Sequence, residues 1–156
     1  ADVPSSSTGI NALETLLKRI IPIIEDTFKS LTTDAVQRES FKMHILNGID
    51  RLLKQVDVNL DAAGGAGDDE VEVEVPDDDG DNTGRNFAYD TFKKINQSIT
   101  SAYEMLGNPE DRNMFKKYLL INVGLYFDKF DDELSTTPDY QSPEDAGFGG
   151  EEEVAL

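Results

Sequence analysis

The chain has 156 residues, no cysteine and a net charge of −18 at pH 7. This length suffices for one domain with its own hydrophobic core. The lack of cysteine excludes a disulfide scaffold and thiol chemistry. No apolar run is long enough to cross a bilayer, and the first residues lack the basic and apolar regions of a secretory signal. We therefore expect no signal peptide, no membrane association, and a location in the cytoplasm or in a virion.

Two segments carry nearly all of the negative charge. Residues 57–86 hold eleven acidic residues against Arg85, a net charge of −10, and residues 135–156 hold six acidic residues and no basic one. The remaining residues have a net charge of −2. Because no basic stripe is present to neutralise phosphates, direct binding to nucleic acid is not expected.

The first predicted helix follows a flexible leader over residues 1–9. Its apolar residues recur at helical spacing, and Pro22 within the run predicts a kink in one continuous helix. These apolar residues are Ile10, Leu13, Leu16, Leu17, Ile20, Ile21, Ile24, Phe28 and Leu31.

The second predicted helix begins after a short junction and ends at Val56. Asp34 and Gln37 have the spacing of a capping box, which marks its start. The shortness of the junction predicts that residues 10–56 form an antiparallel helical hairpin. Gly48 lowers the helix propensity, and we interpret it as a point of close approach to a neighbouring helix.

Residues 57–86 break the helical pattern. A glycine-rich run at residues 64–67 precedes an almost continuous run of acidic residues. So few apolar groups cannot offset the entropy of ordering the chain, and we predict a disordered acidic linker.

Residues 87–134 are predicted to form a second helical hairpin. The third helix has apolar residues that alternate in steps of four and three, the spacing of a helix–helix seam. After Gly107, Asn108 is a suitable N-cap residue and Pro109 a suitable first helical residue. The seam consists of Ala88, Phe92, Ile95, Ile99, Ala102 and Leu106.

These elements predict an all-α protein: a four-helix bundle built of two antiparallel hairpins. Residues 10–56 and 87–134 would form one domain. Residues 135–156, which are acidic and rich in glycine and proline, are predicted to be a mobile tail.

No catalytic, cofactor-binding or metal-binding residue is identified. His44 is the only histidine, so a zinc site or a histidine-dependent nucleophile lacks its parts. The acidic run could form a calcium loop starting at Asp77 or Asp79, but both frames lack required ligands. A solvated acidic linker is the favoured interpretation, and weak calcium binding is the alternative.

The fourth helix is apolar on nearly every side. Met114, Ile121 and Leu125 fall on one side of it, opposite Phe115, Leu119, Tyr126 and Phe130. Because exposed apolar helix surface is usually an interface, these three residues form the candidate interface. We expect a non-enzymatic subunit or adaptor that binds a protein partner or forms a homo-oligomer, as small viral or phage structural and assembly proteins do.

An alternative function is an acidic regulator that masks a basic or nucleic-acid-binding partner. Its acidic docking residues would lie in the linker and at the end of the fourth helix. The candidates are Asp77, Asp78, Asp79, Asp81, Asp131, Asp132 and Glu133.

Overall fold

The computed structural model describes residues 5–61 and 82–147. Within these residues the chain forms four α-helices and no strand: α1 (Ser5–Lys29), α2 (Ala35–Asp61), α3 (Thr83–Glu104) and α4 (Pro109–Leu134). The prediction of an all-α bundle with four helices is confirmed. None of these helices is both long and apolar enough to cross a membrane.

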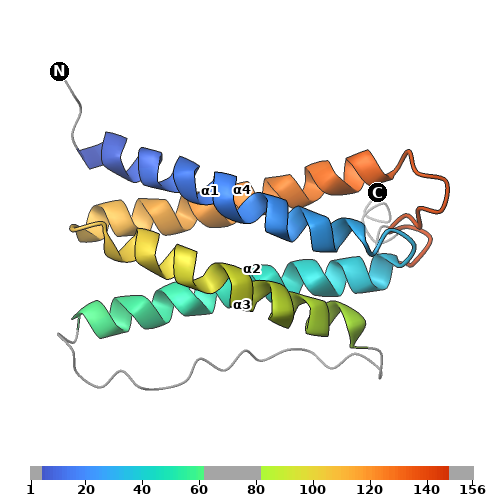
Figure 1. Cartoon of the computed structure of the whole chain (residues 1–156), viewed down its shortest axis with the longest axis horizontal. Helices are drawn as coiled ribbons and strands as arrows, with labels where there is room; N and C mark the ends of the chain where they lie inside the picture. Colours follow the sequence, from blue (N-terminus) through green and yellow to red (C-terminus); the bar gives the residue numbers. More distant parts are fainter. Residues whose placement is uncertain (1–4, 62–81, 148–156) are drawn as a thin grey trace, which may run out of the picture.

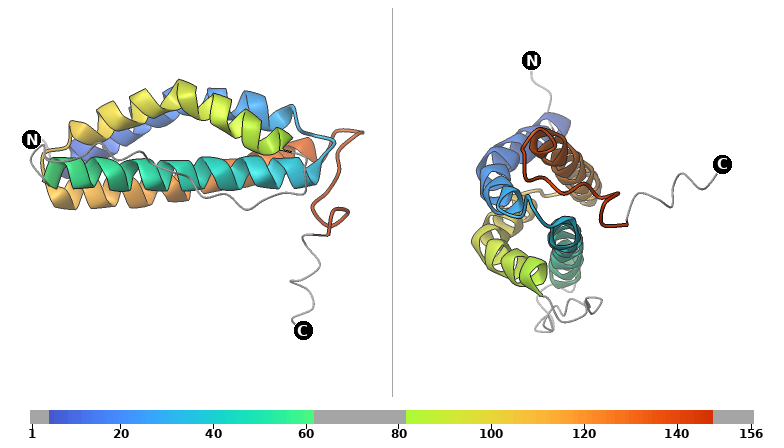
Figure 2. Two further views of the ribbon diagram at one scale, coloured as in Figure 1. Left: turned by 90° about the horizontal axis from the view of Figure 1, so that it is seen from below. Right: turned by 90° about the vertical axis from the view of Figure 1, so that its right-hand side faces the viewer.

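The four helices lie side by side with their long axes roughly aligned (Figure 1). Helices α1 and α4 run in one direction along the bundle, and α2 and α3 run in the opposite direction. The end-on view in Figure 2 shows one helix at each corner, with α1 and α2 on one diagonal and α3 and α4 on the other.

The predicted packing of consecutive helices into two hairpins is not what the structure shows. Helix α2 packs most extensively against α3, and α1 packs against α4, so both extensive pairs are parallel. The short connections after α1 and α3 instead join helices on the two diagonals, which touch little. A short connection fixes the opposite direction of two helices, but it can still cross the end of a bundle to the far corner.

Two glycines allow α2 and α3 to approach closely. A Cβ atom at Gly48 would lie 3.2 Å from the ring of Phe92 in α3, which supports the interpretation of Gly48 as a contact point. At the start of α3, the Gly84 N–H donates a hydrogen bond of 2.6 Å to Gln37 Oε1 in α2. A Cβ atom at Gly84 would clash with the α2 backbone, whereas one at Gly48 would require the Phe92 ring to shift slightly.

The predicted helix starts are confirmed at two positions. Asp34 Oδ1 accepts a hydrogen bond of 3.2 Å from the Gln37 N–H, and Asn108 Oδ1 accepts one of 3.0 Å from the Asp111 N–H. Pro109 is the first residue of α4. Each cap satisfies one of the N–H groups that a helix start leaves without an internal partner.

The core is a single apolar cluster to which all four helices contribute. Four phenylalanine rings from α1, α2 and α4 meet in it, and the Phe28 and Phe127 centroids are 5.1 Å apart. Rings at such separations pack edge to face or tilted, which stabilises the cluster beyond the burial of area alone. The four rings are Phe28, Phe41, Phe127 and Phe130.

The helices extend into the segments predicted as leader and linker. Helix α1 includes Ser5–Gly9, α2 continues to Asp61, and α3 begins at Thr83. Asp57 was predicted to lie in the linker because it begins the acidic segment. In the structure it accepts hydrogen bonds from Tyr103 and Arg112. Partners from distant helices therefore keep this carboxylate within the folded part.

The predicted mobile tail is wrong for residues 135–147. They form turns across the end of the bundle, where Tyr140 packs against the core and the Gln141 N–H donates a hydrogen bond of 3.1 Å to the Thr32 carbonyl. Residues 148–156 lie outside the described residues.

Candidate interaction surfaces

Helix α4 has a second apolar face that points away from the bundle. Met114, Tyr118, Ile121 and Leu125 are 42%, 44%, 47% and 58% exposed, whereas the opposite side of the helix is buried in the core. Their spacing of four, three and four residues places them in one line. We call these four residues the α4 stripe. It contains all three candidate interface residues predicted from the sequence.

One residue of α1 adjoins the stripe. Ile10, 50% exposed, lines a hollow of about 20 Å³ together with Met114 and Tyr118. Ile10 thus widens the exposed apolar surface beside the amino-terminal half of α4.

A carboxylate lies beyond each end of the stripe. Asp111 lies three residues before Met114, and Asp128 lies three residues after Leu125, so both continue the helical line of the stripe. Asp128 is exposed and Asp111 is half-buried. Neither side chain forms a hydrogen bond or ion pair with the described part of the chain.

The predicted acidic docking residues of α4 are mostly paired within the protein. Glu133 accepts a hydrogen bond of 2.6 Å from Lys29 Nζ, which lowers the pKa of the glutamate. Asp131 is bound by Arg38 and Tyr140, while Asp132 is exposed. Of these three residues, Asp132 alone has no side-chain hydrogen bond or ion pair within the described part of the chain. Asp77, Asp78, Asp79 and Asp81 lie outside the described residues.

Arg38 organises the end of the bundle where α2 begins. The residue is 2% exposed, and its Nε donates a hydrogen bond of 3.1 Å to Asp131 Oδ1. Its Nη1 donates to the carbonyls of Leu31 and Thr32, at 3.1 and 2.7 Å. A buried guanidinium is tolerated only when its donors are satisfied in this way.

Tyr140 closes the same network from the carboxyl-terminal segment. Its ring centroid lies 4.7 Å from the Arg38 guanidinium carbon, and its hydroxyl donates a hydrogen bond of 2.8 Å to Asp131 Oδ2. Burial and this hydrogen bond both disfavour the phenolate, and they raise the pKa of Tyr140 to about 12. The network holds residues 135–141 against the bundle.

A second polar network lies at the other end of the bundle. The Tyr103 hydroxyl donates to both oxygens of Asp57, at 3.0 and 2.9 Å, and Arg112 Nε lies 3.4 Å from Asp57 Oδ1. Burial, followed by the bond to Asp57, raises the pKa of Tyr103. This network ties α2 to α3 and α4.

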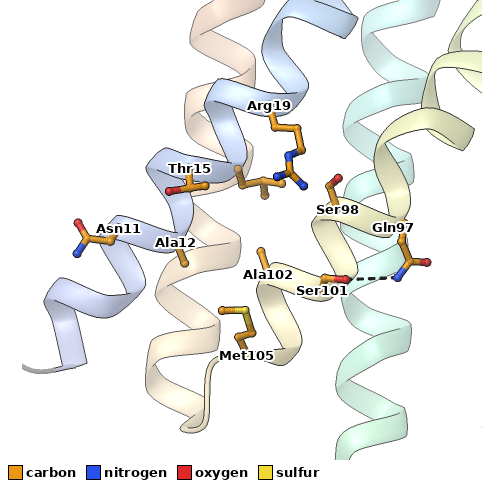
Figure 3. A pocket seen from close by; sticks show the side chains of 10 residues that line it. Asn11, Ala12, Thr15, Arg19, Gln97, Ser98, Ser101, Ala102 and Met105 are labelled. Carbon is orange, nitrogen blue, oxygen red and sulfur yellow. Dashed lines mark hydrogen bonds between the residues drawn. The ribbon is translucent and has the colours of Figure 1, made fainter.

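A shallow groove of about 540 Å³ lies between α1 and α3 (Figure 3). Small and hydroxyl side chains from the two helices face each other across it, and Arg19 is the only charged residue among the described residues that line it. Without a second ionisable group, the groove presents no acid–base pair. Its lining residues are Asn11, Ala12, Thr15, Leu16, Arg19, Gln97, Ser98, Ser101, Ala102 and Met105.

Metal ligands do not gather anywhere in the described part of the chain. His44 interacts with its own helix, since its Nδ1 lies 2.7 Å from the Ser40 carbonyl oxygen, while its Nε2 is buried and has no hydrogen bond to any residue that the structure describes.

Sequence reasoning missed Tyr118, Ile10 and the two flanking carboxylates as parts of the exposed surface. Tyr118 is four residues after Met114 and three before Ile121, so the spacing of the stripe would have found it. Ile10 could not be found in this way, because its nearness to α4 depends on the packing of α1.

Comparisons with protein-family models, curated proteins and solved structures give no match for this chain.

Proposed function

We propose that this protein is a non-enzymatic helical subunit or adaptor that binds another protein through the α4 stripe. The observation that carries the proposal is the row of four large apolar side chains, each about half exposed, on the side of α4 that faces away from the core. A continuous apolar row on an otherwise complete bundle is typical of a surface that is covered by a partner.

The spacing of the stripe favours a helical partner. Steps of four, three and four residues are those of a seam between two helices, in which each side chain fits between side chains of the partner. An extended strand directs side chains to one face about every 6.7 Å, which does not match the repeat of about 5.3 Å along the stripe.

The stripe alone supports only weak binding. Burying the exposed half of a large apolar side chain contributes about 1 kcal/mol, so four such residues contribute about 4 kcal/mol before the loss of translational freedom is subtracted. A complex of useful affinity therefore needs further contacts around the stripe.

The test is a charge placed at the centre of the stripe. Ile121→Glu should abolish association while shifting the melting temperature by less than about 2 °C, because Ile121 is 47% exposed and lies outside the core cluster of the described residues. Tyr89→Glu is the matched control, since Tyr89 is 64% exposed on α3.

Association is measured by size-exclusion chromatography with light scattering, on the purified chain and on the chain added to an extract of its native source. The wild type and Tyr89→Glu should elute in a complex that Ile121→Glu does not form. A wild type that remains a monomer and binds nothing in the extract, or an Ile121→Glu variant that binds as well as the wild type, would contradict the proposal.

A further inference from the structure

We infer that the partner presented to the α4 stripe is an amphipathic helix with a basic residue at each end of its apolar seam. This inference rests on the proposed function and adds the chemistry of the partner. It is carried by the carboxylates of Asp111 and Asp128, which lie on the line of the stripe beyond its two ends.

The position of the two carboxylates gives them a direct role in any complex. In a partner helix that covers the whole stripe and extends one turn beyond each end, the next seam residues face Asp111 and Asp128. Neither carboxylate has an ion pair among the described residues, and Asp128 is exposed. Asp132 follows one turn after Asp128 and adds a second exposed carboxylate at that end.

A second copy of this chain is a poor occupant, because it would bring these carboxylates together. If two α4 helices pack in parallel, Asp111 faces Asp111 and Asp128 faces Asp128. The spacing from Asp111 to Asp128 is three, four, three, four and three residues, which is the same in either direction. Antiparallel packing therefore places Asp111 of one copy opposite Asp128 of the other.

Nearby lysines do not remove this repulsion. Lys129 is directed toward Tyr126, with its Nζ 5.9 Å from the ring centroid, and Lys117 lies at the middle of the stripe rather than at its ends. Like charges that face each other across an interface oppose association, and the net charge of −18 adds to this effect.

The α4 stripe and its two flanking carboxylates define the residue pattern of the partner helix. This pattern has a lysine or arginine, then apolar residues three, seven, ten and fourteen positions later, then a second basic residue three positions after the last of them. Because this spacing is the same in both directions, the requirement holds for parallel and for antiparallel binding. A segment of this length spans about five helical turns.

The experiment uses the full chain and synthetic helical peptides labelled with fluorescein, with binding followed by fluorescence anisotropy. The first peptide has leucine at the four seam positions, lysine at the two end positions, and alanine and glutamine elsewhere. A second peptide has glutamate at both ends, and two further peptides have lysine at one end and glutamate at the other.

The lysine-ended peptide should bind at least tenfold more tightly than the glutamate-ended peptide, and its affinity should fall as sodium chloride rises from about 50 to 500 mM. Ile121→Glu should abolish its binding, and Tyr89→Glu should not change it. Asp128→Lys should weaken binding of the lysine-ended peptide about tenfold. The variant should bind one of the two mixed peptides more tightly than the other, and this preference reveals whether the peptide binds parallel or antiparallel to α4. Lysine near the end of α4 suits the helix dipole, so Asp128→Lys is expected to fold.

Three results would overturn the inference. The lysine-ended and glutamate-ended peptides could bind equally, or neither could bind. Light scattering could show a concentration-dependent dimer that Ile121→Glu abolishes, which would make a second copy the occupant. In each case, loss of association in Ile121→Glu would still uphold the proposed function, so the two failures are distinguishable.

Discussion

Arg38 shows how a single residue depends on parts of the chain far from it in sequence. Arg38 carries a charge, yet the structure buries its guanidinium against Asp131, Tyr140 and two carbonyl groups of the connection after α1. A buried charge is acceptable only with such partners. The same contacts explain why residues 135–141 are folded, although their composition predicted a mobile tail.

The raised pKa of Tyr140 predicts a loss of stability in alkaline solution. The unfolded phenol ionises near 10, whereas burial and Asp131 hold the folded pKa at about 12. The stabilisation from the neutral phenol is therefore complete below pH 10 and is lost as the pH rises from 10 to 12. Urea unfolding at pH 9, 10 and 11 measures this decline, which Tyr140→Phe should make shallower.

The control for this prediction is Tyr89→Phe, because Tyr89 is 64% exposed on α3. It should leave the decline between pH 9 and 11 unchanged. An identical decline in the wild type and in Tyr140→Phe would show that the hydrogen bond to Asp131 does not govern the alkaline behaviour.

At the scale of the helices, the parallel pair α2 and α3 depends on glycine. A Cβ atom at Gly84 would overlap the carbonyl oxygen of Gln37 and lie 2.9 Å from Ser40 Cβ, and both of these atoms belong to α2. The nearest of these atoms is a backbone atom, which cannot rotate away as a flexible side chain can. Gly84 is therefore required by the approach of the two helices rather than by a turn.

Two glycine substitutions should have opposite effects on stability. Gly84→Ala should lower the free energy of unfolding by about 2 kcal/mol or more, because it overpacks the contact with α2. Gly124→Ala should raise it by about 0.5 to 1 kcal/mol, because among the described residues no atom outside the adjacent helix backbone and the two chain neighbours lies within 4 Å of the added methyl group, and alanine favours helix. Urea denaturation followed by circular dichroism measures both. A Gly84→Ala variant as stable as the wild type would contradict the packing of α2 against α3.

At the scale of the whole molecule, the parallel packing of α2 and α3 sets a minimum length for the chain that connects them. Gly84 lies beside Gln37 at one end of the bundle, and Tyr103 lies beside Asp57 at the other. The chain must therefore return from the end of α2 to its beginning, about 35 Å at 1.5 Å per helical residue. Even a fully extended chain needs about ten residues for this distance.

Deletion of residues 64–80 should therefore prevent the native fold. The remaining residues between the two helices reach about 17 Å, roughly half of the required distance. Replacing the same residues by an equally long glycine–serine sequence is the control and should preserve the fold. Circular dichroism and thermal unfolding distinguish these results. A cooperative native-like transition in the deletion variant would show that α2 and α3 are not parallel neighbours.

Local patterns predicted the helices well, and their arrangement poorly. The Asn108 cap and the apolar spacing of each helix are properties of neighbouring residues, so the sequence alone revealed them. The choice of neighbours depends on contacts such as Gly84 with Gln37, which are distant in sequence. The exposure of Met114, Ile121 and Leu125 was predicted, because α4 has more apolar surface than a bundle of four helices can cover. The pairing of Asp131 with Arg38 and of Glu133 with Lys29 was not predicted.

The central claim, that the α4 stripe is the surface on which a partner binds, is tested most directly by site-specific photo-crosslinking. A benzophenone amino acid is placed at Ile121 or, as the control, at Tyr89, and the chain is irradiated in an extract of its native source. We predict a discrete crosslinked protein from position 121 and none from position 89. No crosslink at position 121, or the same crosslinked protein from both positions, would contradict the account.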